Sequence, residues 1–137
     1  MIDPFQDYDQ ACADFRWNVP RHLNMATQVC DLWCERDPDK TAIIDATDLG
    51  NIKHYTYADL SRAADTLAHH LTGLGVSSGD RIGLLRSQDL GTDAVHIAIW
   101  KLGAISIPLF KLFGPEALSS RILDAGAKCV IVDEEGH

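Results

Sequence analysis

The sequence predicts an α/β fold, in which helices flank a mostly parallel β-sheet as layers. Short β-branched segments alternate with amphipathic segments of ten or more residues, and the turns between them are short and often contain glycine. This alternation is typical of right-handed βαβ units. The 137 residues, 46% apolar and 23% charged, suffice for one domain with a buried core. Because no repeat or linker divides them, we expect an N-terminal arm over residues 1–20 and a single domain over 21–137.

The first half of the chain is expected to form a helix, a hairpin and a longer helix. Apolar residues recur at helical spacing over 23–35, namely Leu23, Ala26, Val29, Cys30 and Trp33, and Asp37-Pro38-Asp39 supplies a stop. The β-rich segments 41–46 and 53–56 flank a turn at 48–51 and predict a hairpin. Thr56, with Asp59 at the reciprocal position, predicts a capped helix that ends near Gly73 or Gly75.

The second half alternates strands and helices. Strands are expected at 81–85, 104–108 and 128–133, with a helix over 89–102 between the first two. That helix is apolar nearly all round, so we expect it to be buried on most sides. Pro115 opens a further helix to Ala125, and Gly126 closes it.

Charge and composition disfavour several classes of partner. A net charge of -8 repels phosphate backbones and anionic lipids, so nucleic acid is not an expected partner. The first ten residues lack the pattern of a secretory signal, and the apolar stretches are too short for a membrane span, so a cytoplasmic protein with reduced thiols is expected. Cys30 and Cys34 could face one metal ion, but buried core cysteines are the favoured interpretation, and we predict no metal site.

No motif in the chain indicates a catalytic residue. The glycines from Gly73 to Gly79 superficially suggest a phosphate loop, yet they close a helix and precede a strand, which favours a helix cap and a turn. The histidines share no spacing, and hydrolase, redox and Walker-type motifs are absent from the sequence. The residues alone therefore predict an α/β domain of unspecified function.

Several segments resemble the adenylate-forming acyl-CoA synthetases. Residues 98–118, from a Lys-x-Gly-Ala helix end into a strand that ends in proline, resemble the A2-type motif of that family. Residues 54–60 resemble its "YTYxEL" segment, and residues 74–82 its "LGVxxGDRV" turn and strand. Residues 15–20, 23–26 and 121–128 are similar to the acetyl-CoA and medium-chain acyl-CoA synthetase branch. Because each motif also has a structural interpretation, we expect them to form scaffold rather than to carry chemistry.

The resemblance implies the first part of the N-terminal domain of an AMP-forming synthetase. Such enzymes join a carboxylic acid to ATP with Mg²⁺, release pyrophosphate and pass the acyl group to coenzyme A. The family's triphosphate loop, adenine, magnesium and ribose contacts and C-terminal catalytic lysine have no counterpart in this sequence. We therefore expect a fragment without cofactors or catalytic residues of its own, inactive alone, whose partners are the remainder of the synthetase and, in the whole enzyme, the carboxylate and coenzyme A. Self-association of the fragment is also expected.

The resemblance also implies one ligand contact, with the nucleotide end of coenzyme A. It carries over to the residues after Pro108, namely Phe110, Lys111 and Leu112, although acetyl-CoA synthetases have glycines at the last two positions. Lys111 would pair with a phosphate or be a solvated loop lysine. A non-catalytic α/β interaction module on the same scaffold is the alternative function. A dehydrogenase nucleotide domain is disfavoured, because the glycines fall at the wrong end of a helix.

Overall fold

The computed structural model describes residues 7–134, so the first six residues of the expected arm and His137 lie outside the described part. The elements in chain order are α1 (Tyr8–Asp14), the π-helical turn η1 (Thr27–Asp31), α2 (Leu32–Arg36), β1 (Thr41–Asp45), β2 (Lys53–Thr56), α3 (Tyr57–Gly73), β3 (Arg81–Leu85), α4 (Leu90–Lys101), β4 (Ile105–Pro108), α5 (Pro115–Ala125) and β5 (Cys129–Val132).

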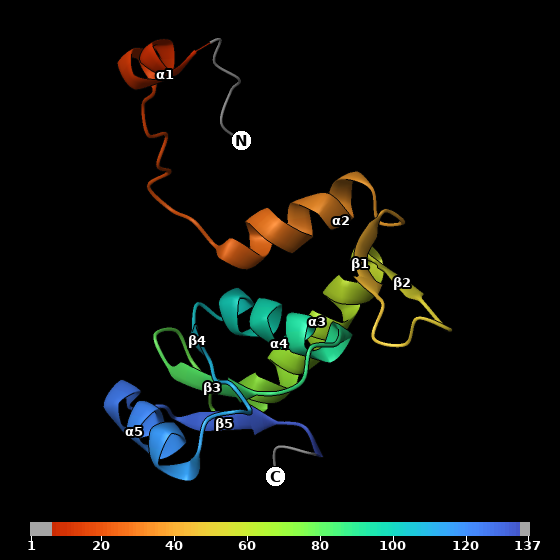
Figure 1. Cartoon of the computed structure of the whole chain (residues 1–137), viewed down its shortest axis with the longest axis vertical. Helices are drawn as coiled ribbons and strands as arrows, with labels where there is room; N and C mark the ends of the chain where they lie inside the picture. The colour runs from red at the N-terminus through yellow and green to blue at the C-terminus, as the bar shows by residue number, and fades with distance from the viewer. Residues whose placement is uncertain (1–6, 135–137) are drawn as a thin grey trace.

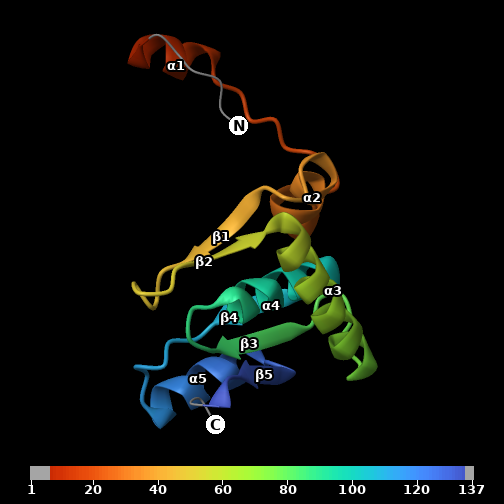
Figure 2. The ribbon, with the colours of Figure 1, turned by 90° about the vertical axis from the view of Figure 1, so that its right-hand side faces the viewer.

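The strands form two sheets. β3 pairs in parallel with β4 on one side and β5 on the other, in the order β4-β3-β5, while β1 and β2 form a separate antiparallel hairpin. The chain passes from β3 through α4 to β4 on one side of β3. It then passes from β4 through α5, back across β3, to β5 on the other side. Right-handed crossovers in opposite directions place their helices on opposite faces, and α4 and α5 do lie on opposite faces of the sheet (Figures 1 and 2). The predicted α/β fold with a parallel sheet is confirmed.

The core lies between the sheet and the helices α3 and α4. Ile82 and Leu84 of β3 point into it and are 0% and 2% exposed. Between them Gly83 faces the opposite side, where a Cβ atom would lie 3.1 Å from Val130 and 3.2 Å from Leu109. The prediction that α4 is buried on most sides is confirmed, since its buried residues are Thr92, Ala94, Val95, Ile97, Ala98 and Ile99.

Helix α3 starts directly at the end of the hairpin. The predicted capping box is confirmed: Asp59 N–H donates to Thr56 Oγ1 (3.1 Å) and Thr56 N–H donates to Asp59 Oδ2 (3.0 Å). The next free amides of the first turn, those of Tyr57 and Ala58, donate to the carbonyls of Lys40 and Pro38, both at 3.0 Å. Every bond in this joint therefore connects α3 to the hairpin or to the turn before it.

Helices α3, α4 and α5 end in the same way. Each is followed by a glycine with positive φ, namely Gly75 (82°), Gly103 (67°) and Gly126 (60°). The next amide then returns to the helix: Val76 to Leu71, Ala104 to Ile99 and Ala127 to Ile122, all at 3.0 Å. This Schellman arrangement confirms the helix ends that the glycines predict.

The first helical segment contains a π-helical turn that the sequence did not indicate. Asn24 caps the whole helical segment, which starts at residue 25: its Oδ1 accepts from Ala26 N–H (2.9 Å), and its Nδ2 donates to the Trp100 carbonyl at the end of α4 (2.8 Å). Ala26 and Cys30 on this segment are fully buried. Asn24 therefore both starts the segment and attaches it to α4.

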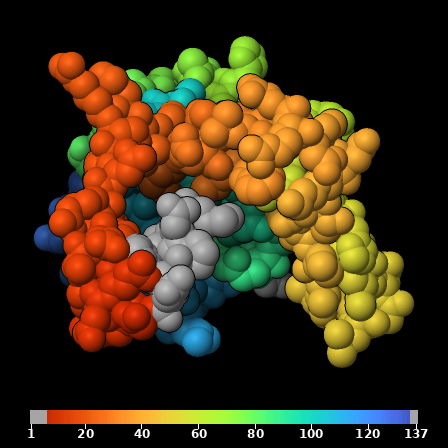
Figure 3. Space-filling view, turned by 90° about the horizontal axis from the view of Figure 1, so that it is seen from above, coloured from red at the N-terminus to blue at the C-terminus, as the bar shows by residue number. Residues whose placement is uncertain are grey.

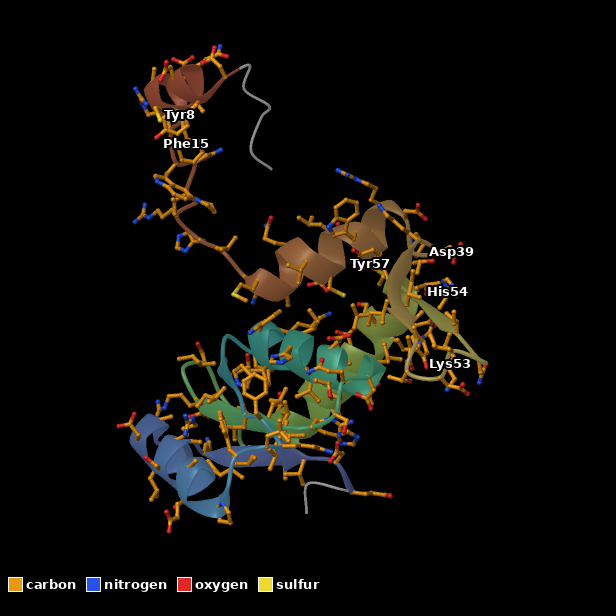
Figure 4. All side chains as sticks on the ribbon, in the orientation of Figure 1. Tyr8, Phe15, Asp39, Lys53, His54 and Tyr57 are labelled. Atoms are coloured by element: carbon orange, nitrogen blue, oxygen red, sulfur yellow. The ribbon has the colours of Figure 1, made fainter. Side chains whose placement is uncertain are left out.

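The arm contains the short helix α1, which the sequence analysis did not predict. Asp7 caps it, with its Oδ1 accepting from Gln10 N–H at 2.8 Å. None of its residues is buried, and Tyr8 and Trp17 are 80% and 81% exposed. Figure 4 shows Tyr8 and Phe15 well away from the sheet and its helices. The division into an arm and a domain portion remains a prediction.

Candidate functional site

The motif residues 74–82 and 121–128 meet at the amino edge of the parallel sheet. Lys128 Nζ donates to Asp80 Oδ2 and to the Gly75 carbonyl, both at 2.7 Å. Ser77 N–H donates to the same carboxylate at 2.8 Å. The hydrogen bond from Lys128, followed by that from the Ser77 amide, lowers the pKa of Asp80 to about 2. The ionised Asp80 carboxylate therefore links the turn before β3 to the start of β5.

Arg81 extends this network to the end of α5. Its Nε donates to the Ala125 carbonyl (2.8 Å) and its Nη2 to the Gly126 carbonyl (3.1 Å). Gly79 N–H donates to the Gly103 carbonyl at 3.0 Å, beside the end of α4. Cationic donors suit the negative ends of helices. These motif segments therefore hold three helix ends together.

The Lys-x-Gly-Ala motif is also used for packing. Lys101 Nζ contacts Asp31 Oδ1 at 2.7 Å and Asp65 Oδ1 at 2.6 Å, and the Lys101 side chain is only 17% exposed. These ion pairs connect α4 with η1 and α3. The lysine is thus engaged in the scaffold.

Open α/β folds usually bind ligands at the carboxyl edge of the sheet, in the crevice where successive connections turn to opposite sides. Here Ser87 follows β3 and Asp133 follows β5, and the Ser87 N–H donates to Asp133 Oδ2 at 2.7 Å. Lys111, on the loop after β4, donates from Nζ to Ser87 Oγ and to Asp133 Oδ2, both at 2.7 Å. The Lys111 side chain is 27% exposed and that of Asp133 20%. One carboxylate thus joins the ends of all three parallel strands.

The three residues expected at coenzyme A share this loop but differ in exposure. Phe110 is 67% and Leu112 97% exposed, whereas Lys111 is bound to Ser87 and Asp133. Phe110 also packs edge-on against Phe113, with ring centroids 5.5 Å apart. Ser87, Asp133 and Phe113 were not among the predicted site residues. Their position directly after strand ends was the available signal for Ser87 and Asp133.

The N-terminus of α4 lies at the same edge and is filled by the chain's own side chains. Asp89 caps the helix by accepting from Thr92 N–H at 2.7 Å. Arg86, with 19% of its side chain exposed, contacts Asp89 at 3.3 Å, Thr92 Oγ1 at 3.2 Å and the Val132 carbonyl at 3.3 Å. The Asp89 carboxylate therefore already supplies the negative charge that the N-terminus of α4 favours.

A second feature is a hollow of about 310 Å³ between the hairpin and α4 (Figure 3). Its lining is mostly apolar, and Asp93, His96 and the phenol of Tyr57 are its ionisable groups. Burial raises the pKa of Asp93 and lowers the pKa of His96, although each partly offsets the effect on the other. His96 Nδ1 and Ser106 Oγ lie within hydrogen-bond distance at 3.0 Å, and Trp100 Nε1 donates to the same hydroxyl oxygen at 3.2 Å. Because Ser106 lies within β4 under α4, this group links strand and helix.

The cysteines behave as core or surface thiols. Cys30 is fully buried, and this burial raises its pKa. Cys12, Cys30, Cys34 and Cys129 are all unpaired. Within residues 7–134, no group of three or more His, Cys, Asp or Glu side chains could hold a metal ion. No helix in the same part of the chain is long and apolar enough to cross a membrane.

Comparisons with known proteins point to one family. The acetyl-coenzyme A synthetase of Sodalis glossinidius (strain morsitans) is 31% identical over 98% of this chain, which covers 22% of that protein. Acetyl-coenzyme A synthetase 1 of Candida albicans is 34% identical over 98% of the chain, covering 20% of that protein. The chain thus spans about a fifth of the length of these curated relatives.

Solved structures agree with this likeness. The crystal structure of Brucella canis acyl-CoA synthetase superposes with a TM-score of 0.85 at 26% identity, over 93% of this chain and 25% of that one. The crystal structure of CmiS6 shares the fold, with a TM-score of 0.75 at 24% identity over 87% of this chain and 29% of that one. A family model described as "AMP-binding enzyme" matches residues 30–137. The chain therefore belongs to the family of AMP-binding enzymes.

Proposed function

We propose that this chain is the scaffold-forming N-terminal part of an AMP-forming acyl-CoA synthetase and that it forms no acyl-adenylate by itself. The observation that carries the proposal is the match over 98% of the chain to about a fifth of acetyl-CoA synthetases. The contacts of the shared motifs support it. The charged side chains of Asp80, Arg81 and Lys101 bind helix ends or form ion pairs within the fold.

We expect that the described residues alone do not bind Mg²⁺-ATP. A triphosphate in a synthetase needs several converging donors and a metal site to balance its charge. At the carboxyl edge, Lys111 and Arg86 are each bound to a carboxylate of the chain itself, and residues 7–134 contain no metal-ligand cluster. ATP, Mg²⁺ and the carboxylate would then be bound by the remainder of the synthetase, which is the expected partner. The arm over 1–20, a cytoplasmic location and the absence of a nucleic-acid partner belong to the same proposal.

The chain's own contribution to ligand binding would be the loop after β4. Phe110, Lys111 and Leu112 are the proposed contacts with the nucleotide end of coenzyme A. The exposure of Phe110 and Leu112 supports this role, since both offer apolar surface to a planar ring.

The adenylation claim is tested with the purified chain. We expect acetate, ATP and Mg²⁺ to release no pyrophosphate above the buffer rate, and hydroxylamine to trap no acyl group. Titration calorimetry with ATP should show no saturable heat. An acyl hydroxamate formed in proportion to the concentration of the chain would refute the proposal.

The alternative is a stand-alone interaction module without catalysis. Uncovered apolar side chains favour the fragment instead, since Ile105, Leu112 and Leu123 are 52%, 97% and 76% exposed. Light scattering and thermal melting separate the two: a strictly monomeric chain with a cooperative transition would support the module.

A further inference from the structure

We propose that His96 is a proton-sensitive contact: its neutral imidazole joins α4 to β4 beside the hairpin, and its protonation in mildly acidic solution releases the hairpin from α4. The contact is a chain of hydrogen bonds from Trp100 through Ser106 to His96, at the hollow between the hairpin and α4. It is independent of the proposed function, because it involves only groups within the described part of the chain.

Donor and acceptor chemistry assigns a direction to both hydrogen bonds. The indole N–H of Trp100 can only donate, so the Ser106 oxygen accepts it at 3.2 Å. The hydroxyl hydrogen of Ser106 is then donated to His96 Nδ1, 3.0 Å away, since it has no other acceptor among residues 7–134. Nδ1 is therefore unprotonated, and the ring hydrogen of the neutral imidazole lies on Nε2.

The same arrangement does not suit an imidazolium. A protonated Nδ1 must donate, so the Ser106 oxygen would accept two N–H groups and its own hydrogen would lose its acceptor within the described residues. The ring also lines a mostly apolar hollow, where a positive charge is poorly hydrated. Burial lowers the pKa of His96 accordingly, and Asp93 only partly opposes this effect.

The groups that face the imidazole only partly compensate a charge on it. Asp93 of α4 lines the same hollow, but no carboxylate of the described chain lies within ion-pair distance of the ring. Helix α3 contributes the phenol of Tyr57, while the lining side chains of η1 and the hairpin are apolar. Lys101, further along α4, is bound to Asp31 and Asp65.

Movement of the hairpin would improve the hydration of an imidazolium. The hairpin lines the hollow opposite α4 through Ala42 and Ile43 (Figure 3). A state in which these residues have moved away from α4 exposes the ring to water, so it binds a proton on His96 more tightly than the docked state does. Acid therefore raises the population of this open state.

The direction of the pKa shift gives the pH range. The pKa of His96 is lowered from 6.5 in the docked state, so the docked state keeps its full advantage above about pH 6.5. That advantage decreases as the pH falls below 6.5, because the open state takes up the proton first. The contact thus responds to mild acid, well above the range in which carboxylates titrate.

The first test is the long-range ¹H–¹⁵N spectrum of the histidine rings in the wild-type chain, which distinguishes protonated from unprotonated ring nitrogens. We expect His96 to carry its hydrogen on Nε2 at pH 7.5 and to titrate with a midpoint below 6.5. A hydrogen on Nδ1 at pH 7.5, or a midpoint at or above 6.5, would overturn the inference without any substitution.

The second test measures the open state by relaxation dispersion of the Ala42 and Ile43 methyl groups. Between pH 7.5 and 5.5, we expect its population to rise about three- to tenfold in the wild type. In His96→Asn the amide oxygen can replace Nδ1 as the acceptor but does not titrate, so the population should stay constant. His69→Asn, at an exposed histidine of α3, is the matched control and should behave as the wild type.

Asp93→Asn separates the two ionisable groups of the hollow. Loss of the carboxylate should lower the midpoint of His96 further and increase the rise of the open state at pH 5.5. An equal response to pH in His96→Asn and the wild type would assign the change to another group and refute the role of His96. A wild-type chain without methyl exchange at either pH would also refute it, and neither result bears on the adenylation assay.

Discussion

Asp80 illustrates how one ionised side chain connects segments that are far apart in the chain. Its carboxylate accepts hydrogen bonds from Lys128 and from the Ser77 amide, and its pKa falls to about 2. Because the folded pKa is lower than the unfolded one, the stabilisation is present above the unfolded value, near pH 4, and is lost as the pH falls through about 2. We therefore expect Asp80→Asn to lower the melting temperature at pH 7 and to flatten the dependence of stability on pH between 4 and 2.

Urea unfolding at a series of pH values checks this prediction. Asp124→Asn, an exposed aspartate on α5, is the control and should leave the curve unchanged. Equal acid sensitivity of Asp80→Asn and the wild type would show that other carboxylates govern acid unfolding.

Pairings between single residues were the part of the site least accessible from the sequence. Lys111 was expected at a phosphate or in solvent, and the structure places it against Ser87 and Asp133, 24 residues before and 22 residues after it. A sequence pattern reports neighbours along a helix or strand, and it carries no information on which loop meets which strand end. The contact of the Arg121 guanidinium with the Phe113 ring was missed for the same reason, because Phe113 lies outside α5.

Helix ends, in contrast, follow from local chemistry. Gly103 has a φ of 67°, and a Cβ atom there would lie 2.9 Å from Ser78 Oγ. We expect Gly103→Ala to destabilise the fold by about 1–2 kcal/mol, because an L-residue is strained in the left-handed region and the hydroxyl must also move. Chemical denaturation measures this difference.

Gly73 provides the matched comparison for that substitution. It ends α3 with φ outside the left-handed region, and a Cβ atom there would meet nothing within 4 Å. Gly73→Ala should be neutral or slightly stabilising, since alanine favours the helix. Equal losses at both positions would mean that backbone strain at Gly103 is not the cause.

The elements themselves were predicted well where pattern and cap agreed, and poorly elsewhere. Thr56 with Asp59, Pro115 and the closing glycines mark real boundaries, because each satisfies or replaces backbone groups within one turn. The π-helical turn Thr27–Asp31 has no such local signal. Helix α1 has a local signal, the N-cap Asp7. No stripe of apolar residues accompanies it, so the hydrophobic pattern did not predict a helix there.

At the scale of the whole molecule, the parallel sheet has open edges among the described residues 7–134. β4 and β5 are both edge strands, and α5 buries no residue of its own. We therefore expect the purified chain to self-associate through the β4 edge and the α5 face, with a mean mass that rises with concentration. Multi-angle light scattering over a dilution series measures this.

One substitution tests whether the β4 edge is the surface through which copies of the chain associate. Ile105→Lys, on the β4 edge, should shift the dissociation midpoint to about tenfold higher concentration, because a lysine opposes strand pairing. Leu49→Lys, in the hairpin turn and 82% exposed in the wild type, should leave it unchanged. A monomer at all concentrations would contradict the expectation and favour the interaction module.

The joint between β2 and α3 affects hydrogen exchange at the first amides of α3. In most helices the first amides face water and exchange their hydrogens quickly, but here those of Tyr57 and Ala58 are held by Lys40 and Pro38. Their deuterium uptake is therefore governed by release of the hairpin rather than by fraying of the helix. The exchange rates of these two amides therefore report whether the hairpin is packed against the start of α3.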